Sequence, residues 1–254
     1  MSRDGFRLED VGGVRIVRCE ALEDLRGIAH AFSTRVASGR SDFDLGPAAD
    51  PPAEIVARRE AFVRAAGMPE ARPAVLRQVH GTTLVASGES AEADGGIAIV
   101  AEGLRAAPAV RSADCVTLLI ADREGGAVAS VHAGWRGTAA GIARVAVETL
   151  AARGVPAERL VAALGPAVGP CCYEVGPEVA RSFPGFARPA GGGRVTLDLH
   201  GANAAQLATA GIPARAIHRA PWCTRCRNDL FFSVRAEGRR AGRLMAVIGV
   251  SGQS

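Results

Sequence analysis

Three residues that can do chemistry stand at the ends of apolar runs in this sequence. Cys115 begins one run in SADCVTLLIAD, and His132 ends the next in ASVHAGWRG. His80 ends an earlier run in VLRQVHG, directly before a glycine. Side chains at strand ends can converge on one edge of a sheet, where functional sites commonly form. The three residues are therefore a candidate site, although each one alone is typical of a core or surface residue.

Three chemistries fit one cysteine and two histidines. Zinc takes thiolate and imidazole ligands, and three protein ligands with an open fourth position make a catalytic site. A Cys–His pair can instead be a nucleophile and its base, here Cys115 with His132. Blue copper needs a weak axial methionine, and the only internal methionines are Met68 and Met245. Copper is therefore the less favoured metal, and these residues leave the other two chemistries open.

A candidate anion site follows His132 directly. The sequence GWRGTAAGIARVAVETL predicts a helix over Thr138–Arg153, with Arg136 and Gly137 at its start. Free backbone N–H groups, the helix dipole and a guanidinium together favour an anion, most often a phosphate. The alternative is that Arg136 only pairs or caps locally. Asp114, in the tripeptide ADC, is expected to hydrogen-bond to a ligand histidine or to cap its turn.

The remaining cysteines are expected to be structural. Cys223 and Cys226 form a Cys-x-x-Cys pair in PWCTRC, but Trp222 and the absence of a His-x-Glu pair break the nucleobase deaminase signature. We expect this pair to be dispensable for chemistry. Cys171 and Cys172 are adjacent, and adjacent side chains point to opposite sides, so we expect them not to share one tetrahedral metal. All four are interpreted as small packing residues.

Composition excludes several functions. The chain has 254 residues and a formal charge of +4, and every basic residue is an arginine. The absence of lysine rules out a Schiff-base lysine and a P-loop lysine. The arginines are not interleaved regularly with aromatic residues, so no nucleic-acid partner is expected. The polar start MSRDGFRLED and the lack of a long apolar run predict no signal peptide, no membrane partner and a cytoplasmic location.

Hydrophobic periodicity predicts a mixed α/β fold. Helical patterns occur at three places, over 51–66, 138–153 and 202–210. Strand patterns are more numerous and run over 14–18, 28–33, 74–79, 96–100, 116–121, 127–131, 160–164, 195–199 and 244–250. Because the two kinds do not alternate strictly, a doubly wound parallel sheet is disfavoured. No repeat or long linker interrupts the chain, so we expect a single domain over residues 1–254.

Several segments together resemble the laccase-domain, YfiH-like purine nucleoside phosphorylase family, formerly labelled multicopper polyphenol oxidase. The resemblance covers about residues 30–250 and rests on HAFSTR, RQVHG, ADCVTLLIAD, SVHAGWRGTAAGI, LGPAVGPCCYEVG, ANAAQL and CTRCRNDLFFSVR. It implies an α/β fold with a mixed β-sandwich core flanked by helices, distantly like cysteine-hydrolase domains. It also implies that His80, Cys115 and His132 hold a zinc ion.

The resemblance implies a function as well. It indicates zinc-dependent phosphorolysis of adenosine, inosine, guanosine and methylthioadenosine, together with hydrolytic deamination of adenosine. The partners would be purine nucleosides and phosphate, in a monomer or homodimer. Phosphorolysis needs a bound anion, for which Arg136, Gly137 and Arg35 of FSTR are the candidates. Deamination needs activated water, and zinc in an open site lowers the pKa of bound water to about 7.

Two other functions fit the same residues. The first is a cysteine-dependent amidase that acts in peptidoglycan-precursor editing, with Cys115 as nucleophile and His132 as base. The second is a non-catalytic metal-binding or partner module. Metal analysis and the phosphate dependence of any activity separate the three functions.

Overall fold

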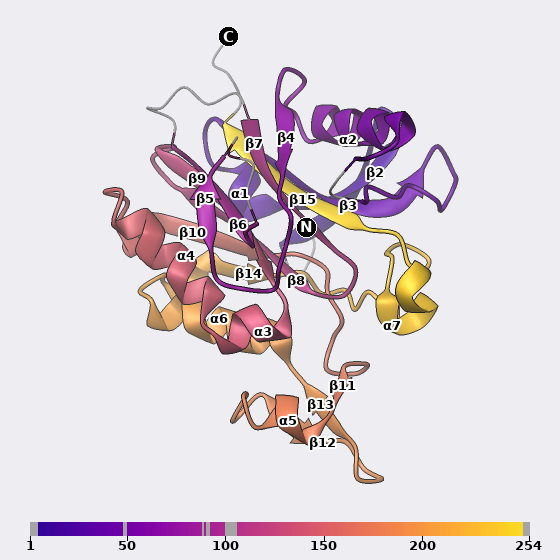
Figure 1. Ribbon diagram of the computed structural model, residues 1–254. Helices are drawn as coiled ribbons and strands as arrows, with labels where there is room; N and C mark the ends of the chain where they lie inside the picture. The colour runs from indigo at the N-terminus through magenta and orange to yellow at the C-terminus, as the bar shows by residue number, and fades with distance from the viewer. Residues whose placement is uncertain (1–4, 48–49, 88, 90–91, 100–105, 251–254) are drawn as a thin grey trace.

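Two six-stranded sheets pack face to face and form the centre of the molecule (Figure 1). The computed structural model describes residues 5–47, 50–87, 89, 92–99 and 106–250. The first sheet consists, in spatial order, of β1 (Phe6–Val11), β2 (Val14–Cys19), β3 (Ile28–Ala37), β15 (Leu244–Val250), β7 (Ala106–Ser112) and β4 (Arg72–Val75). The second consists of β14 (Ile217–Arg219), β10 (Leu160–Leu164), β8 (Val116–Asp122), β9 (Ala127–Ala133), β6 (Gly95–Ile99) and β5 (Leu84–Ala86). Most neighbours are antiparallel, and the pairs β4–β7, β10–β14 and β5–β6 are parallel.

Helices cover the outer faces of this sandwich. α2 (Ala53–Ala65) packs on β2, β3 and β4 of the first sheet. α4 (Ile142–Ala151) packs on β9, and α6 (Leu199–Thr209) packs on β10 and β14 of the second sheet (Figure 1). The result is a helix–sheet–sheet–helix arrangement.

The remaining elements are short and irregular. They are α1 (Glu20–Glu23), α3 (Trp135–Ala139), α5 (Pro177–Ala180), α7 (Val234–Glu237) and the 3-10 turns Ala157–Arg159, Ala214–Ala216 and Gly238–Arg240. A small sheet made of β11 (Glu174–Val175), β13 (Val195–Leu197) and β12 (Ala187–Pro189) projects from the sandwich together with α5 (Figure 1). No helix of the described chain is long and apolar enough to cross a bilayer.

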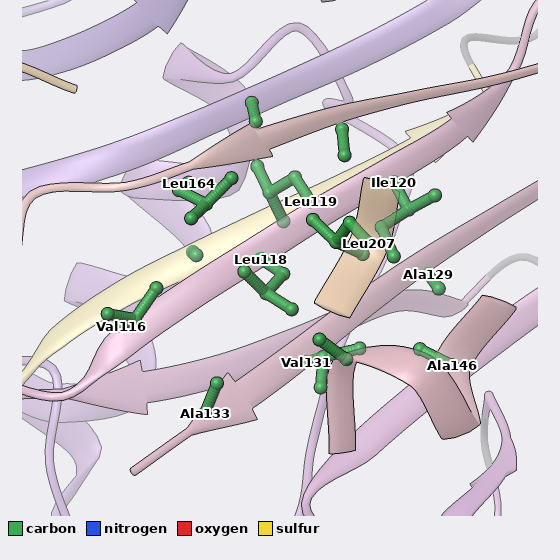
Figure 2. Packing of buried hydrophobic residues seen from close by; sticks show 14 of the residues in the cluster. Val116, Leu118, Leu119, Ile120, Ala129, Val131, Ala133, Ala146, Leu164 and Leu207 are labelled. Atoms are coloured by element: carbon green, nitrogen blue, oxygen red, sulfur yellow. The ribbon is translucent and has the colours of Figure 1, made fainter. Parts of the chain in front are cut away.

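β8 and β9 are the centre of the hydrophobic core. Both strands are buried at every position, as expected for strands that are covered on both faces. Figure 2 shows their Val, Leu, Ile and Ala side chains packed with Leu164 of β10, Ala146 of α4 and Leu207 of α6. A second cluster fills the space between the first sheet and α2 and includes Phe62, Met68 and Met245.

The predicted mixed α/β class and the sandwich flanked by helices are confirmed. The likeness to cysteine-hydrolase domains and the single domain stay predictions. Each predicted strand overlaps an observed one, but the strand predicted over 74–79 ends at Val75. The strand predicted over 195–199 ends at Leu197, because the Asp198 carboxylate caps α6 through the Gly201 N–H, and α6 therefore begins earlier than predicted. No hydrophobic pattern predicts β1, β5, β7, β11, β12 or β14.

The helix predicted over 138–153 is two helices. α3 ends at Ala139, and α4 begins after Gly141, whose φ of 88° is left-handed and suits glycine. The break turns α3 toward the loop that carries His80. At Gly137 an added Cβ would lie 2.8 Å from the Gly81 carbonyl oxygen, so this helix and that loop are in close contact.

The buried position of Leu119 in β8 predicts a large effect of truncation. Leu119 is 0% exposed, so Leu119→Ala removes core contacts and leaves a cavity, which costs about 2–5 kcal/mol of unfolding free energy. Val56 on α2 is 41% exposed, and Val56→Ala should change the free energy by less than about 0.5 kcal/mol. Denaturant unfolding of both variants measures this, and equal effects would contradict the placement of the core.

Candidate functional site

The structure brings His80, Cys115 and His132 together at one end of the second sheet. Their ligand atoms lie within 4.8 Å of one another, and the two imidazole rings meet edge to face with centroids 4.9 Å apart. Cys115 directly precedes β8, His132 lies in β9 opposite Thr117, and His80 lies in the loop between β4 and β5. One thiolate and two imidazoles at this spacing can bind one metal ion.

A buried carboxylate that the sequence analysis missed orients this triad. Asp94 is 0% exposed, and its Oδ1 lies 3.0 Å from Nδ1 of His132. An ionised carboxylate only accepts, so Nδ1 carries the proton and Nε2 is the free ligand atom of His132. The same carboxylate accepts the backbone N–H groups of His80 at 3.0 Å and Gly81 at 2.6 Å. Asp94 therefore fixes two of the three candidate ligands.

The only sequence signal for Asp94 is weak. It is an acidic residue immediately before the apolar run of β6, in the stretch AEADGG. Antiparallel pairing of β6 with β9 sets Gly95 opposite Val131, which carries Asp94 to the side of His132. That proximity depends on strand register, which the sequence of this segment does not reveal.

The backbone leaves room at the centre of the triad. A Cβ added at Gly134 would lie 3.0 Å from Cδ2 of His80 and 3.2 Å from Sγ of Cys115, so a side chain there would crowd the ligands. His80 and Asp114 have positive φ angles of 62° and 99°, which are uncommon for residues other than glycine. Strained backbone of this kind clusters at functional sites, where surrounding contacts hold it.

The electrostatics of the triad favour a thiolate. Burial by itself raises the pKa of Cys115, but the charge of His132 and hydrogen bonds from His132 and His80 outweigh it and lower the pKa to about 6. Burial by itself lowers the pKa of His132, but the Cys115 thiolate and the Asp94 carboxylate raise it to about 9. Without a metal, Cys115 is therefore ionised at neutral pH, which both metal binding and nucleophilic attack require.

The triad lines a cavity of about 380 Å³ that also holds three arginines, namely Arg111, Arg235 and Arg243. None of the three forms an ion pair with a carboxylate of the described residues. Nε of Arg111 is buried and has no hydrogen-bond partner among the residues that the structure describes. Burial and the charges of Arg59 and Arg243 lower the pKa of Arg111 to about 10. The cavity therefore carries positive charge that no described carboxylate pairs.

Arg35 does not line this cavity. Its guanidinium pairs with Glu237 at 3.1 Å, donates to the Asn228 carbonyl at 3.0 Å and lies 4.3 Å from the centre of the Phe232 ring. These contacts tie β3 to the loop around α7. The role of Arg35 in phosphate binding stays a prediction, and its Nε and Nη1 donors already have partners.

Arg136 and Gly137 are also outside the lining of the cavity. Arg136 is exposed and lies 4.4 Å from the centre of the Trp135 ring. The expected long helix is the five-residue α3, and the close approach of Gly137 to the Gly81 carbonyl explains why a glycine is needed there. The phosphate roles of both residues stay predictions without support from this cavity.

Asp114 lines the cavity but does not contact a ligand histidine. Its carboxylate accepts the Thr224 hydroxyl at 2.7 Å and the Arg235 backbone N–H at 2.7 Å. The expected contact with a histidine is made by Asp94 instead. Asp114 therefore ties the turn before Cys115 to the loop that holds Thr224 and to the start of α7.

The structure also corrects the prediction about the cysteines. The sulfur atoms of Cys171, Cys172, Cys223 and Cys226 lie within 4.8 Å of one another. The expectation that adjacent cysteines point apart is wrong here, because Cys171 and Cys172 lie in a turn and not in a strand. The Cys-x-x-Cys pair comes from the loop that follows β14.

Comparison with known proteins identifies the family. The model of the multi-copper polyphenol oxidoreductase laccase family matches residues 29–251. The chain belongs to this family. The resemblance seen in the sequence motifs is therefore confirmed, and the match covers all three metal-ligand motifs and both cysteine pairs.

Relatives with names that state an activity are similar over different lengths. A purine nucleoside phosphorylase of Deinococcus radiodurans is 35% identical over 240 residues, which are 88% of this chain and 89% of that protein. Adenosine deaminase RL5, from an unknown prokaryotic organism, is 39% identical over 142 residues, about half of each chain (53% and 54%). The crystal structure of YlmD from Geobacillus stearothermophilus superposes with a TM-score of 0.85 at 30% identity and covers 98% of this chain and 100% of that one.

The contacts of Asp94 predict that its charge supports metal binding. Asp94→Asn keeps the shape but removes the charge and sets an amide among N–H donors, so zinc affinity should fall by about 10- to 100-fold. Chelator competition on purified protein measures the affinity. Asp122→Asn is the matched control, because Asp122 is equally buried and bonded to Arg159 at the far end of β8. Equal loss of zinc in both variants would mean that Asp94 only stabilises the fold.

Proposed function

We propose that the protein is a zinc-dependent purine nucleoside phosphorylase that also deaminates adenosine. One observation carries this proposal: a thiolate–imidazole triad shares a cavity with three arginines that no described carboxylate pairs. Such a cavity suits a substrate pair in which one member is an anion. The proposed substrates are adenosine, inosine, guanosine and methylthioadenosine, with phosphate. The names of the relatives support both activities.

Zinc is the metal that this donor set fits best. Met68 and Met245 are buried in the cluster under α2 and do not line the cavity, so neither can supply the axial thioether of a blue-copper site. His30 accepts the Cys19 N–H, and Nε2 of His200 lies 2.8 Å from the Gly165 carbonyl oxygen, so neither joins the triad. Zinc bound by the triad would supply Lewis acidity and would lower the pKa of a water molecule at its open position.

The arginines of the cavity are the proposed phosphate site. Phosphate must be held under the anomeric carbon while the base departs, and guanidinium groups bind phosphate oxygens through paired N–H donors. Burial is the main cause of the lowered Arg111 pKa and the charges of Arg59 and Arg243 add to it, so an anion between Arg111 and Arg243 would offset part of this effect. This proposal replaces Arg136 and Arg35 as the principal candidates, because neither lines the cavity.

The wall of the cavity offers a binding surface for the purine ring of the substrate. Tyr173 lines the cavity, and the Arg235 guanidinium lies 4.8 Å from the centre of its ring. Burial, with the charge of Cys115, raises the pKa of Tyr173 to about 12, so its hydroxyl is neutral and can donate. An aromatic face with a hydroxyl donor suits a purine, which has ring nitrogens that accept.

A cysteine-dependent amidase is the second candidate, because Cys115, His132 and Asp94 also have the order of a nucleophile, a base and an orienting carboxylate. In that function His80 has no required part. The same carboxylate holds the backbone N–H of His80, and an imidazole placed beside the thiolate in this way is better explained as a further metal ligand.

Phosphate dependence tests the proposed function. Purified protein with inosine should form ribose 1-phosphate only when phosphate is present, and adenosine without phosphate should give inosine. Cys115→Ala should abolish both reactions together with the zinc of the triad, because one ligand is lost. Product analysis by chromatography gives the answer. If the protein forms neither product but hydrolyses an amide substrate, with activity kept after removal of zinc and lost on thiol alkylation, the amidase is favoured and the proposal is overturned.

Replacing Arg111 should lower phosphorolysis, whereas replacing Arg136 should not. Arg111→Met removes a charge-assisted contact worth roughly 1.5–3 kcal/mol, so phosphorolysis should fall about ten- to hundred-fold with a raised KM for phosphate. Deamination without phosphate should fall much less. Its matched control is Arg136→Met, an exposed arginine outside the cavity, which should leave both reactions near the wild-type level. If Arg136→Met instead lowers phosphorolysis alone, the helix start binds the phosphate after all.

A further inference from the structure

A second cluster of thiols has the geometry of a metal site. The Sγ atoms of Cys171 and Cys226 are 3.6 Å apart, those of Cys172 and Cys226 are 3.4 Å apart, and all four sulfurs lie within 4.8 Å. Tetrahedral zinc with Zn–S bonds of about 2.3 Å sets its sulfurs about 3.8 Å apart. The cluster is thus close to the size that four thiolates around one zinc ion need.

The backbone around the cluster leaves space and supplies N–H donors. A Cβ added at Gly169 would lie 3.3 Å from Sγ of Cys171 and 3.3 Å from Cβ of Cys223, so a side chain would press on the sulfurs. The Gly169 N–H donates to Sγ of Cys223 at 3.2 Å. The N–H groups of Cys172 and Tyr173 both bond to the Gly169 carbonyl at 2.9 Å, which forms the tight turn that carries two adjacent cysteines to one side.

Four thiols this close together would repel one another if more than one were ionised. A divalent cation at the centre removes that repulsion and lets all four bind as thiolates.

The cluster lies where two loops from different parts of the chain meet. Cys171 and Cys172 follow β10, and the Cys-x-x-Cys pair follows β14. The Thr224 N–H donates to the Ala167 carbonyl at 3.0 Å, and Ala167 and Cys223 form an isolated parallel bridge. Tyr173 continues the first loop into the cavity wall, and the Thr224 hydroxyl holds Asp114. A metal ion bound here would hold the two loops together and would thereby stabilise Tyr173 and Asp114 in the cavity wall.

We propose that Cys171, Cys172, Cys223 and Cys226 bind a structural zinc ion through four thiolates, separate from the metal of the His80–Cys115–His132 triad. Cys171 and Cys226 are exposed, which gives the ion a path of entry. Four protein ligands close the coordination shell, so this zinc stabilises the loops and has no open position for substrate. The proposal does not depend on the enzymatic activity, because its test measures bound metal.

Metal content of matched variants, purified in reductant without added metal, tests the proposal. Wild-type protein should hold about two zinc ions per chain, and Cys115→Ala and Cys226→Ser about one each. The double variant should hold none. Cys19→Ala is the matched control, since Cys19 is buried away from both clusters, and it should keep two. A wild-type content of one zinc that Cys226→Ser leaves unchanged would overturn the proposal.

X-ray absorption on the Cys115→Ala variant tests the coordination directly. Its remaining zinc should have four sulfur neighbours at about 2.3 Å and no nitrogen neighbours. If Cys226→Ser does not fold, cobalt titration of demetallated wild-type protein gives the same answer. A strong thiolate charge-transfer band from a second, sulfur-rich site supports the zinc site. Disulfides among these cysteines in protein prepared without oxygen, found by mass spectrometry, would show a redox cluster instead.

Discussion

The contact on which the candidate site depends is the buried carboxylate of Asp94. It bonds to the His132 ring and to the backbone N–H groups of His80 and Gly81, so it orients a side chain and a loop at once. A buried carboxylate needs such partners, because leaving it unpaired in the interior is costly. The pairing of β6 with β9 delivers it to His132, and the site is therefore a product of the sheet and not of its loops alone.

In both cysteine-containing clusters a glycine lies close to the ligand atoms. Gly134 lies beneath the triad and Gly169 beneath the four thiols, and at each a Cβ would come within 3.3 Å of cluster atoms. In both places a glycine lets sulfur atoms approach the backbone closely. Neither glycine is needed for a left-handed φ, since neither has a positive φ. Glycine suits these two positions because a side chain would crowd the ligand atoms.

The sequence predicted the elements with strong periodicity and the ligands at their ends. β8, β9 and α2 were predictable because apolar runs or helical caps mark them, and Cys115 and His132 flank two of those runs. Asp94 and the arginines of the cavity were not, because register and loop packing bring them together over long separations. The phosphate assignment to Arg136 relied on a long helix that the left-handed Gly141 divides. The cysteine cluster was missed because a turn was treated as extended chain.

The position of His80 is what distinguishes a metal site from a nucleophile with its base. Cys115, His132 and Asp94 satisfy both chemistries, so their geometry alone decides nothing. His80 adopts a positive φ of 62°, and the Asp94 carboxylate holds its backbone N–H there at 3.0 Å. Such a conformation costs about 1–3 kcal/mol and persists only where surrounding contacts impose it. If the imidazole of His80 only lay beside the thiolate and bound nothing, the free-energy cost of this backbone conformation would serve no function. The proposed role as a third metal ligand gives it one, since three protein ligands with an open fourth position form a catalytic zinc site.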